Sequence, residues 1–333
     1  MIKNVTDLPY SIRMIDNIWI PMSDEVKLSA RVWLPEDAET NPVPALLEYI
    51  PYRKNDFTAL RDSIRHPYLA GHGYACVRVD MRGSGDSDGI LLDEYLKQEQ
   101  DDALEVIEWL ESQSWCDGNV GMFGKSWGGF NSLQVAARRP PALKAIIALC
   151  ATDDRYATDV HYVGGALLAS DMLPWATYML NRNAMPPAPH IVGESWREMW
   201  MERLEHMMPF SETWLNHQRR DDYWKHGSVC ESYDDIECPV YIVTGWADCY
   251  LAPVFNLLEG LSVPRKGLIG PWAHEYPTVA KPNPAIGFMQ EMLRWWDYWL
   301  KDKPTGIMDE PMLRLWAQES VKPQHQYDVR PGR

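Results

Sequence analysis

The residues with the clearest chemical potential surround Ser126, in the stretch GKSWG from Gly124 to Gly128. This stretch fits the G-x-S-x-G pattern of a nucleophile elbow, in which a serine occupies the tight turn between a strand and a helix. The pattern alone decides little, since it should occur by chance in roughly one chain in ten of this length. Its context is more specific, because residues 120–123 predict a buried strand before the serine and residues 130–138 a helix after it.

A serine hydroxyl becomes a nucleophile when a base removes its proton, and that base is usually a histidine oriented by a carboxylate. Asp248 and His274 follow Ser126 in the order Ser, Asp, His of α/β-hydrolases, and each comes just after a predicted strand. Reactive groups of an open α/β sheet gather at the carboxyl ends of its strands. Two rival carboxylates, Asp153 and Asp154, also follow a predicted strand. The other histidines considered lack that position and are expected in surface or loop positions: His72, His161 and His217.

The elements that must position these residues alternate between strand and helix. Apolar runs predict strands over 14–20, 26–34, 45–50, 74–80, 120–123, 143–150, 240–244 and 267–270, and helices over 63–70, 98–114, 130–138 and 286–300. The first two strands predict a hairpin, and the later alternation predicts a mostly parallel sheet flanked by helices.

Residues 152–237 mix tryptophan, methionine, proline and charged residues without a clear strand, which predicts a helical cap inserted into the sheet domain. The expected organisation is therefore a first part of the α/β core (1–151), the cap (152–237), the second part of the core (238–305) and a linker (306–333). Within that linker, residues 311–316 could form the first strand of a further domain.

The loop MRGSGDSDG, residues 81–89, allows three interpretations. It lacks the lysine of a phosphate-binding P-loop and the distal glutamate of a calcium loop. We favour a turn at a strand end, whose arginine and aspartate tie neighbouring loops together.

Composition excludes several classes of function. The net charge of −15 argues against a nucleic-acid partner, and no apolar run is long enough to span a membrane. The first seven residues lack an apolar signal core, and the six cysteines form no C-x-x-C pair. We therefore expect a cytoplasmic protein with reduced thiols and no metal site.

Three motifs together resemble those of the cocaine esterase and X-Pro dipeptidyl-peptidase family of serine hydrolases: Gly124-Lys-Ser-Trp-Gly-Gly, Gly245-Trp-Ala-Asp248 and Gly270-Pro-Trp-Ala-His274. Further stretches match the same family: residues 80–89, residues 115–124 and residues 294–301. The resemblance covers nearly the whole chain and implies the α/β-hydrolase fold with a Ser126, Asp248 and His274 triad.

The resemblance also implies roles for other residues. Tyr52, in Pro51-Tyr-Arg-Lys, matches the tyrosine that completes the family's oxyanion hole, together with the backbone N–H of Trp127. Trp175 and Tyr250 match aromatic residues that wall the acyl pocket. Two features depart from the family. We expect the family's usual jelly-roll domain to be absent or truncated in this sequence. Val160 stands where cocaine esterases have an aromatic residue, which disfavours a benzoyl acyl group.

We thus expect a serine hydrolase that cleaves an ester or amide of a small molecule or short peptide through an acyl-enzyme, without a cofactor. The enzyme alternative is an X-Pro dipeptidyl-peptidase, whose pocket would need a carboxylate for the substrate ammonium, with Asp153, Asp154 and Asp159 as candidates. The alternative from another class is a non-catalytic binding module, which an intact triad disfavours. A missing domain would expose apolar surface, so a homo-oligomer is expected as well.

Overall fold

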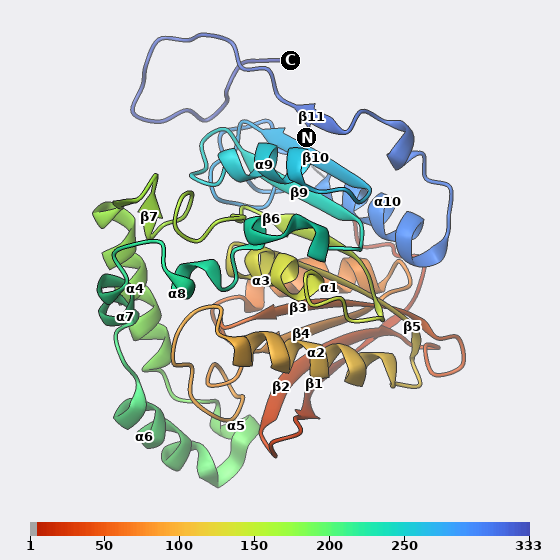
Figure 1. Cartoon of the computed structure of the whole chain (residues 1–333). Helices are drawn as coiled ribbons and strands as arrows, with labels where there is room; N and C mark the ends of the chain where they lie inside the picture. Colours follow the sequence, from red (N-terminus) through yellow and green to blue (C-terminus); the bar gives the residue numbers. More distant parts are fainter. Residues whose placement is uncertain (1–4) are drawn as a thin grey trace.

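The computed structural model describes residues 5–333, so the first four residues of the N-terminal stretch without a signal core lie outside it. A nine-stranded sheet forms the centre of the molecule (Figure 1). Its strands are β1 (Ile12–Pro21), β2 (Lys27–Pro35), β3 (Val43–Ile50), β4 (Ala75–Asp80), β5 (Cys116–Lys125), β6 (Leu143–Leu149), β9 (Val240–Gly245), β10 (Arg265–Gly270) and β11 (Leu313–Leu315).

The strand order is β1-β2-β4-β3-β5-β6-β9-β10-β11. The β1–β2 hairpin and the β2–β4 pair are antiparallel, and every later pair is parallel. The central strands are buried on both faces, which explains why they appear in the sequence as continuous apolar runs rather than alternating ones. The predicted mostly parallel sheet is confirmed, including its opening hairpin.

Helices cover both faces of this sheet. The helices of the core are α1 (Ala59–Ala70), α2 (Lys97–Glu111), α3 (Trp127–Ala136), α9 (Ala252–Gly260) and α10 (Phe288–Lys301). α1 packs with α10, and α2 packs with α3. α3 begins at Trp127, three residues before the predicted helix, because Gly128 and Gly129 lie inside its first turn. α1 also begins earlier than predicted, at Ala59.

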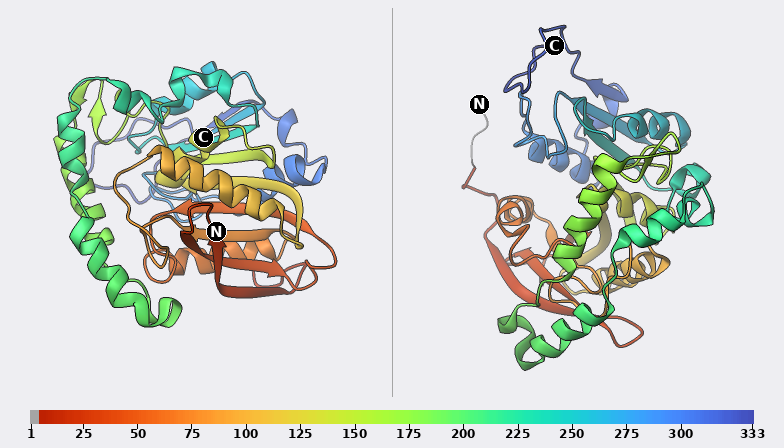
Figure 2. Two further views of the ribbon diagram at one scale, coloured as in Figure 1. Left: turned by 60° about the horizontal axis from the view of Figure 1, so that its bottom comes forward. Right: turned by 90° about the vertical axis from the view of Figure 1, so that its left-hand side faces the viewer.

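The segment between β6 and β9 forms an arm along one side of the core, drawn in green in Figure 2. Its helices are α4 (Ala169–Asn183), α5 (Pro189–Val192), α6 (Trp196–His206), α7 (Phe210–Asn216) and α8 (Asp222–Lys225). The segment also contains a short antiparallel pair, β7 (Tyr162–Val163) and β8 (Ala166–Leu167), although no strand is clear there in the sequence. Two-residue strands leave no periodic signal in a sequence. None of the helices in the described part of the chain has the length and apolar character needed to cross a membrane.

The loop 81–89 is a strand-end turn that ties neighbouring loops together. Arg82 pairs with Asp102, and Asp86 accepts a hydrogen bond from Lys54 Nζ at 2.7 Å. Asp86 also accepts from the backbone N–H of Ala188 in the green arm. The third interpretation of this loop is therefore confirmed, and the turn links the sheet to the arm between β6 and β9.

Candidate active site

Ser126 occupies a strained turn between β5 and α3. Its φ of 59° is in the left-handed region, where a non-glycine residue is uncommon. The flanking glycines have a steric reason, because a Cβ on Gly124 would lie 2.5 Å from the backbone of Gly128, and a Cβ on Gly128 would lie 2.8 Å from Ile50 Cγ2. The turn is pinned by the Ser126 N–H, which donates to Leu149 O at 2.9 Å. Backbone strain held in this way is typical of a functional position.

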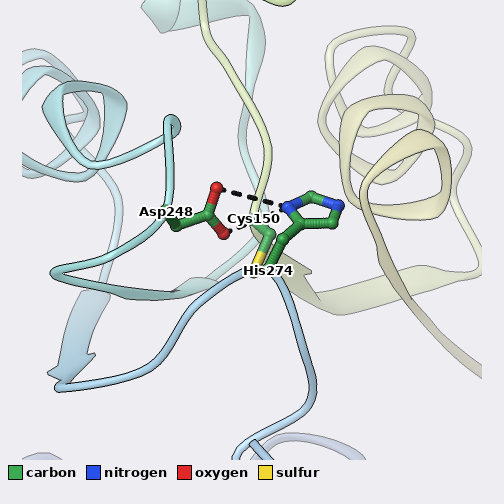
Figure 3. Close-up of side chains that lie close together, drawn as sticks. All are labelled: Cys150, Asp248 and His274. Carbon is green, nitrogen blue, oxygen red and sulfur yellow. Dashed lines mark hydrogen bonds and ion pairs between the residues drawn. The ribbon is translucent and has the colours of Figure 1, made fainter. Parts of the chain in front are cut away.

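Asp248 and His274 form a hydrogen-bonded pair beyond the ends of β9 and β10 (Figure 3). His274 Nδ1 lies 3.1 Å from Asp248 Oδ2 and 3.2 Å from Oδ1. Burial would raise the pKa of Asp248, but the hydrogen bond and charge of His274 hold that pKa below its usual value. The Asp248 side chain is fully buried, whereas 38% of the His274 side chain is exposed. This leaves Nε2 of His274 as the nitrogen available for proton transfer.

Cys150 comes directly after β6, and its side chain lies beside this pair (Figure 3). Ligand atoms of Cys150, Asp248 and His274 lie within 4.8 Å of one another, a spacing that could hold a metal ion. Burial, followed by the negative charge of Asp248, raises the pKa of the Cys150 thiol well above its usual value. A protonated Cys150 thiol can donate a hydrogen bond to Asp248.

The rival residues have other partners. Asp153 accepts hydrogen bonds from Tyr233 and Asn256, and Asp154 pairs with Arg220 and accepts from backbone N–H groups. His72 contacts a backbone carbonyl, and His217 contacts Asp221. His161 lies in a loop as expected, but it is buried rather than at the surface.

Tyr52 follows the end of β3, and its side chain lies with Ser126 in the wall of one cavity. Its ring packs edge-on against Trp127 and Trp175, with centroids 6.3 and 6.2 Å away. Burial, followed by the negative charge of Glu94, raises the pKa of Tyr52 well above its usual value. The hydroxyl therefore stays protonated and can donate a hydrogen bond.

The backbone N–H of Trp127 lies in the first turn of α3, where N–H groups have no partner within the helix. The Trp127 indole is fixed by Glu99, which accepts its N–H at 2.8 Å. Burial raises the pKa of Glu99 to about 8. A developing oxyanion beside Ser126 could thus meet two donors, the Tyr52 hydroxyl after β3 and the Trp127 N–H at the start of α3.

Two cavities meet at Ser126 and His274. The first, here called the Arg182 cavity, has a volume of about 590 Å³ and includes Tyr52 and Arg182 in its wall. The second, the Tyr250 cavity, has a volume of about 430 Å³ and includes Tyr250. The two cavities share four wall residues: Ser126, Trp175, Tyr178 and His274. An acyl carbon on Ser126 could therefore carry one group into each cavity.

The wall of the Tyr250 cavity includes four aromatic residues, Tyr95, Trp175, Tyr178 and Tyr250, and Val160 also lies in it. Tyr250 packs against the His274 ring at 5.6 Å and donates its hydroxyl to Asp159 at 2.9 Å. Trp175 donates its indole N–H to Glu94, which is itself in the cavity wall.

His161 lies between Glu94 and Asp159, the hydrogen-bond acceptors of Trp175 and Tyr250. It contacts Glu94 at 2.8 Å and Asp159 at 2.9 Å, and the side chains of all three are 1% exposed. Burial alone would lower the pKa of His161, but the charges of Asp159 and Glu94 overcome that effect and raise it to about 9. A buried imidazolium thus links the partner of Tyr250 to the partner of Trp175.

This cluster predicts a pH-dependent stability. Because the pKa of His161 is higher in the folded state than its unfolded value near 6.5, its contribution is complete below about pH 6.5 and is lost as the pH rises through about 9. The difference in free energy of unfolding between the wild type and His161→Gln should therefore fall by about 3 kcal/mol across this window. Urea unfolding between pH 6 and 10 measures it. Other groups that titrate there, such as Glu99, are common to both proteins, so parallel curves would contradict the charged His161.

Comparison with known proteins places this site in a family. The model of the X-Pro dipeptidyl-peptidase (S15) family matches residues 24–276, well over half of the chain. The chain belongs to this family. Cocaine esterase from Rhodococcus sp. (strain MB1 Bresler) is 28% identical over 94% of this chain and 59% of its own length.

Solved structures show the same fold for this S15-family chain. A CocE/NonD family hydrolase from Staphylococcus aureus superposes with a TM-score of 0.73 at 22% identity, over 92% of this chain and 53% of its own. An aminopeptidase from the marine sediment archaeon Thaumarchaeota archaeon gives a TM-score of 0.69 at 21% identity, over 100% of this chain and 61% of its own. The α/β-hydrolase fold is therefore confirmed, and the chain spans little more than half the length of these relatives.

Sequence reasoning missed several residues of this S15-family site. Cys150 follows a strand end, as Ser126 and Asp248 do, so its position was a usable signal. Glu94 and His161 carry no local signal, since each acquires its partner from a distant segment. Lys125, inside the elbow, donates to the His274 carbonyl at 3.2 Å and pairs with Glu275.

Proposed function

We propose that this S15-family protein is a serine hydrolase that cleaves an ester or amide bond of a small molecule or short peptide through an acyl-serine intermediate. The observation that carries the proposal is that Ser126 and His274 lie in the wall of the same cavity. Ser126 occupies a strained turn, and His274 Nδ1 is hydrogen-bonded to the buried Asp248. The S15 relatives support the same chemistry. A fluorophosphonate that labels one serine of the purified protein, together with hydrolysis of chromogenic esters, tests it.

In the proposed reaction, Ser126 Oγ attacks the carbonyl carbon while His274 Nε2 takes the hydroxyl proton. Asp248 stabilises the resulting imidazolium and keeps the ring oriented. The tetrahedral intermediate then collapses, and the leaving group takes the proton from His274 as its bond to the acyl carbon breaks. Water repeats the same steps in the second half and frees Ser126. Tyr52 and the Trp127 N–H donate to the oxyanion in both halves.

The oxyanion role of Tyr52 predicts a kinetic effect. Tyr52→Phe should lower kcat by about 10²- to 10³-fold with little change in KM, because the donor acts mainly in the transition state. Steady-state hydrolysis of a chromogenic ester measures both constants. Tyr178→Phe is the matched control, since Tyr178 lies in the walls of both cavities. A Tyr52 variant within a few-fold of wild type would reduce Tyr52 to a packing residue.

A specific observation also favours the dipeptidyl-peptidase alternative. Glu94 and Asp171 lie in the wall of the Tyr250 cavity, where they could face a substrate ammonium. Against this, Glu94 is already paired with the His161 imidazolium. The aspartates named from sequence have other partners and are not in that wall: Asp153, Asp154 and Asp159. Comparing kcat/KM for a neutral acyl ester and an Xaa-Pro anilide separates the two activities. An anilide preference that Glu94→Gln removes would establish the peptidase.

A further inference from the structure

The Arg182 cavity is positively charged although the protein carries a net charge of −15. Four cationic side chains lie in its wall: Arg61, Arg65, Lys125 and Arg182. Opposing them are Glu275 in the wall and two carboxylates behind it, Glu48 and Asp62. A cavity with this balance attracts anions, and its low-dielectric walls strengthen the field.

Three of these cations already have carboxylate partners. Arg61 contacts Glu48 and Asp62 at 3.0 Å each, and Arg65 contacts Glu48 at 3.5 Å. Lys125 contacts Glu275 at 3.2 Å. Each of these three cations therefore has a carboxylate oxygen within 3.5 Å.

Arg182 differs from them. Within residues 5–333 no ion pair engages it, and its buried Nε has no hydrogen-bond partner there. Its guanidinium stacks on the rings of Phe57 and Tyr178, the second with a centroid 4.3 Å away. Stacking on two rings satisfies the faces of the guanidinium and holds it in place, but leaves its edge N–H groups free to donate. A preorganised donor fork of this kind matches a carboxylate.

The position of Arg182 relates this charge to the reacting bond. Trp175, Tyr178 and Arg182 follow one another on one face of α4 at spacings of three and four residues. Trp175 lies against Tyr52 near Ser126, and Arg182 is two helical turns further on, about 10 Å along the axis. A substrate that reaches both Ser126 and Arg182 would thus carry a rigid spacer between its scissile bond and its anionic group. This spacer would lie along the Tyr178 ring.

We infer that the Arg182 cavity is the leaving-group site and that it selects a leaving group with one carboxylate, held by the edge of the Arg182 guanidinium. This inference rests on the proposed acyl-serine chemistry. Glu94 and Asp171 in the wall of the Tyr250 cavity disfavour an anion there, so the acyl group enters that cavity and the anionic leaving group enters the other cavity that meets at Ser126. One unpaired cation among apolar neighbours such as Ile64 and Val279 fits a single negative charge better than a dianion.

Acetate esters of 4-hydroxybenzoate and 4-hydroxybenzamide test this inference, because they differ only in a carboxylate or a neutral carboxamide. The ratio of their kcat/KM values should fall by about 10- to 100-fold in Arg182→Gln, because the carboxylate ester loses more than the carboxamide ester. A circular dichroism spectrum equal to that of the wild type reports an intact fold. The intrinsic reactivities of the esters cancel in this comparison. Added salt should reduce the wild-type preference. Arg197→Gln is the matched control, since Arg197 stacks on Trp196 outside both cavities.

An unchanged ratio in Arg182→Gln would overturn the inference, and so would an equal loss in Arg197→Gln. An Arg182-dependent preference for a carboxylate on the acyl side, measured with 4-nitrophenyl hemiglutarate and 4-nitrophenyl butyrate, would overturn the assignment of the two cavities. Titration calorimetry with free 4-hydroxybenzoate and 4-hydroxybenzamide separates this inference from the proposed function. Arg182-dependent binding of the benzoate without hydrolysis of any ester would support the anion site and contradict the hydrolase.

Discussion

Ser126→Ala is expected to lower kcat for ester hydrolysis by about 10⁶-fold, because the substitution removes the only atom that can form the acyl intermediate in the proposed reaction. The remaining rate should still exceed that of the reaction in water, since the oxyanion donors and the cavities are retained. The same variant should no longer be labelled by a fluorophosphonate, which mass spectrometry of the intact protein measures directly.

Ser170→Ala is the control for this experiment, because Ser170 also lies in the wall of the Tyr250 cavity but is exposed and donates to Asp171. It should retain both labelling and hydrolysis. Labelling that persists in Ser126→Ala would show that another serine is the nucleophile and would remove the basis of the proposed mechanism.

Asp248→Asn is expected to lower kcat by about 10⁴-fold while the protein stays folded. An asparagine in this position can donate its amide N–H to His274 Nδ1. The imidazole would then carry its proton on Nε2, where it cannot accept the proton of Ser126. The carboxylate that stabilises the imidazolium would also be lost. Steady-state kinetics of ester hydrolysis, with circular dichroism as the check on folding, measures this effect.

The rival carboxylate provides the control. Asp154→Asn should change kcat by no more than a few-fold, because Asp154 serves Arg220 and two backbone N–H groups rather than His274. An Asp248→Asn variant within tenfold of wild type would show that the Asp248–His274 pair is structural. A loss in Asp154→Asn as large as in Asp248→Asn would return Asp154 to the candidates.

The central sheet was predictable because the sequence patterns that indicate its strands are local. The buried parallel strands are continuous apolar runs, and the turn after β5 needs glycines on both sides of Ser126. Element ends were less accurate for an equally physical reason. α3 starts at Trp127 because tertiary contacts hold Gly128 and Gly129 in a helical turn, although glycine has a poor intrinsic helix propensity.

The order Ser126, Asp248, His274 could be derived from the chain, because each residue follows a strand and parallel strands end at one edge of the sheet. The environment of these residues could not. The thiol of Cys150 beside Asp248 and the support of Trp175 by Glu94 join segments that are distant in sequence. No pattern of residue types specifies which side chain a loop will place against which partner.

The sequence by itself determined the family, the layering of sheet and helices and the candidate nucleophile, base and orienting carboxylate. The family follows from the resemblance of the motifs around Ser126, Asp248 and His274. The layering and the candidate residues follow from short-range periodicity, from steric demands on single turns and from the polarity of parallel strands. Only the tertiary structure decided which charges are neutralised and which are not. Arg61, Arg65, Lys125 and Arg182 are alike as cations in the sequence, and packing leaves Arg182 alone among them without a carboxylate within residues 5–333. Electrostatic balance depends on distances between side chains, and those distances are set by the packing of segments that are distant in sequence.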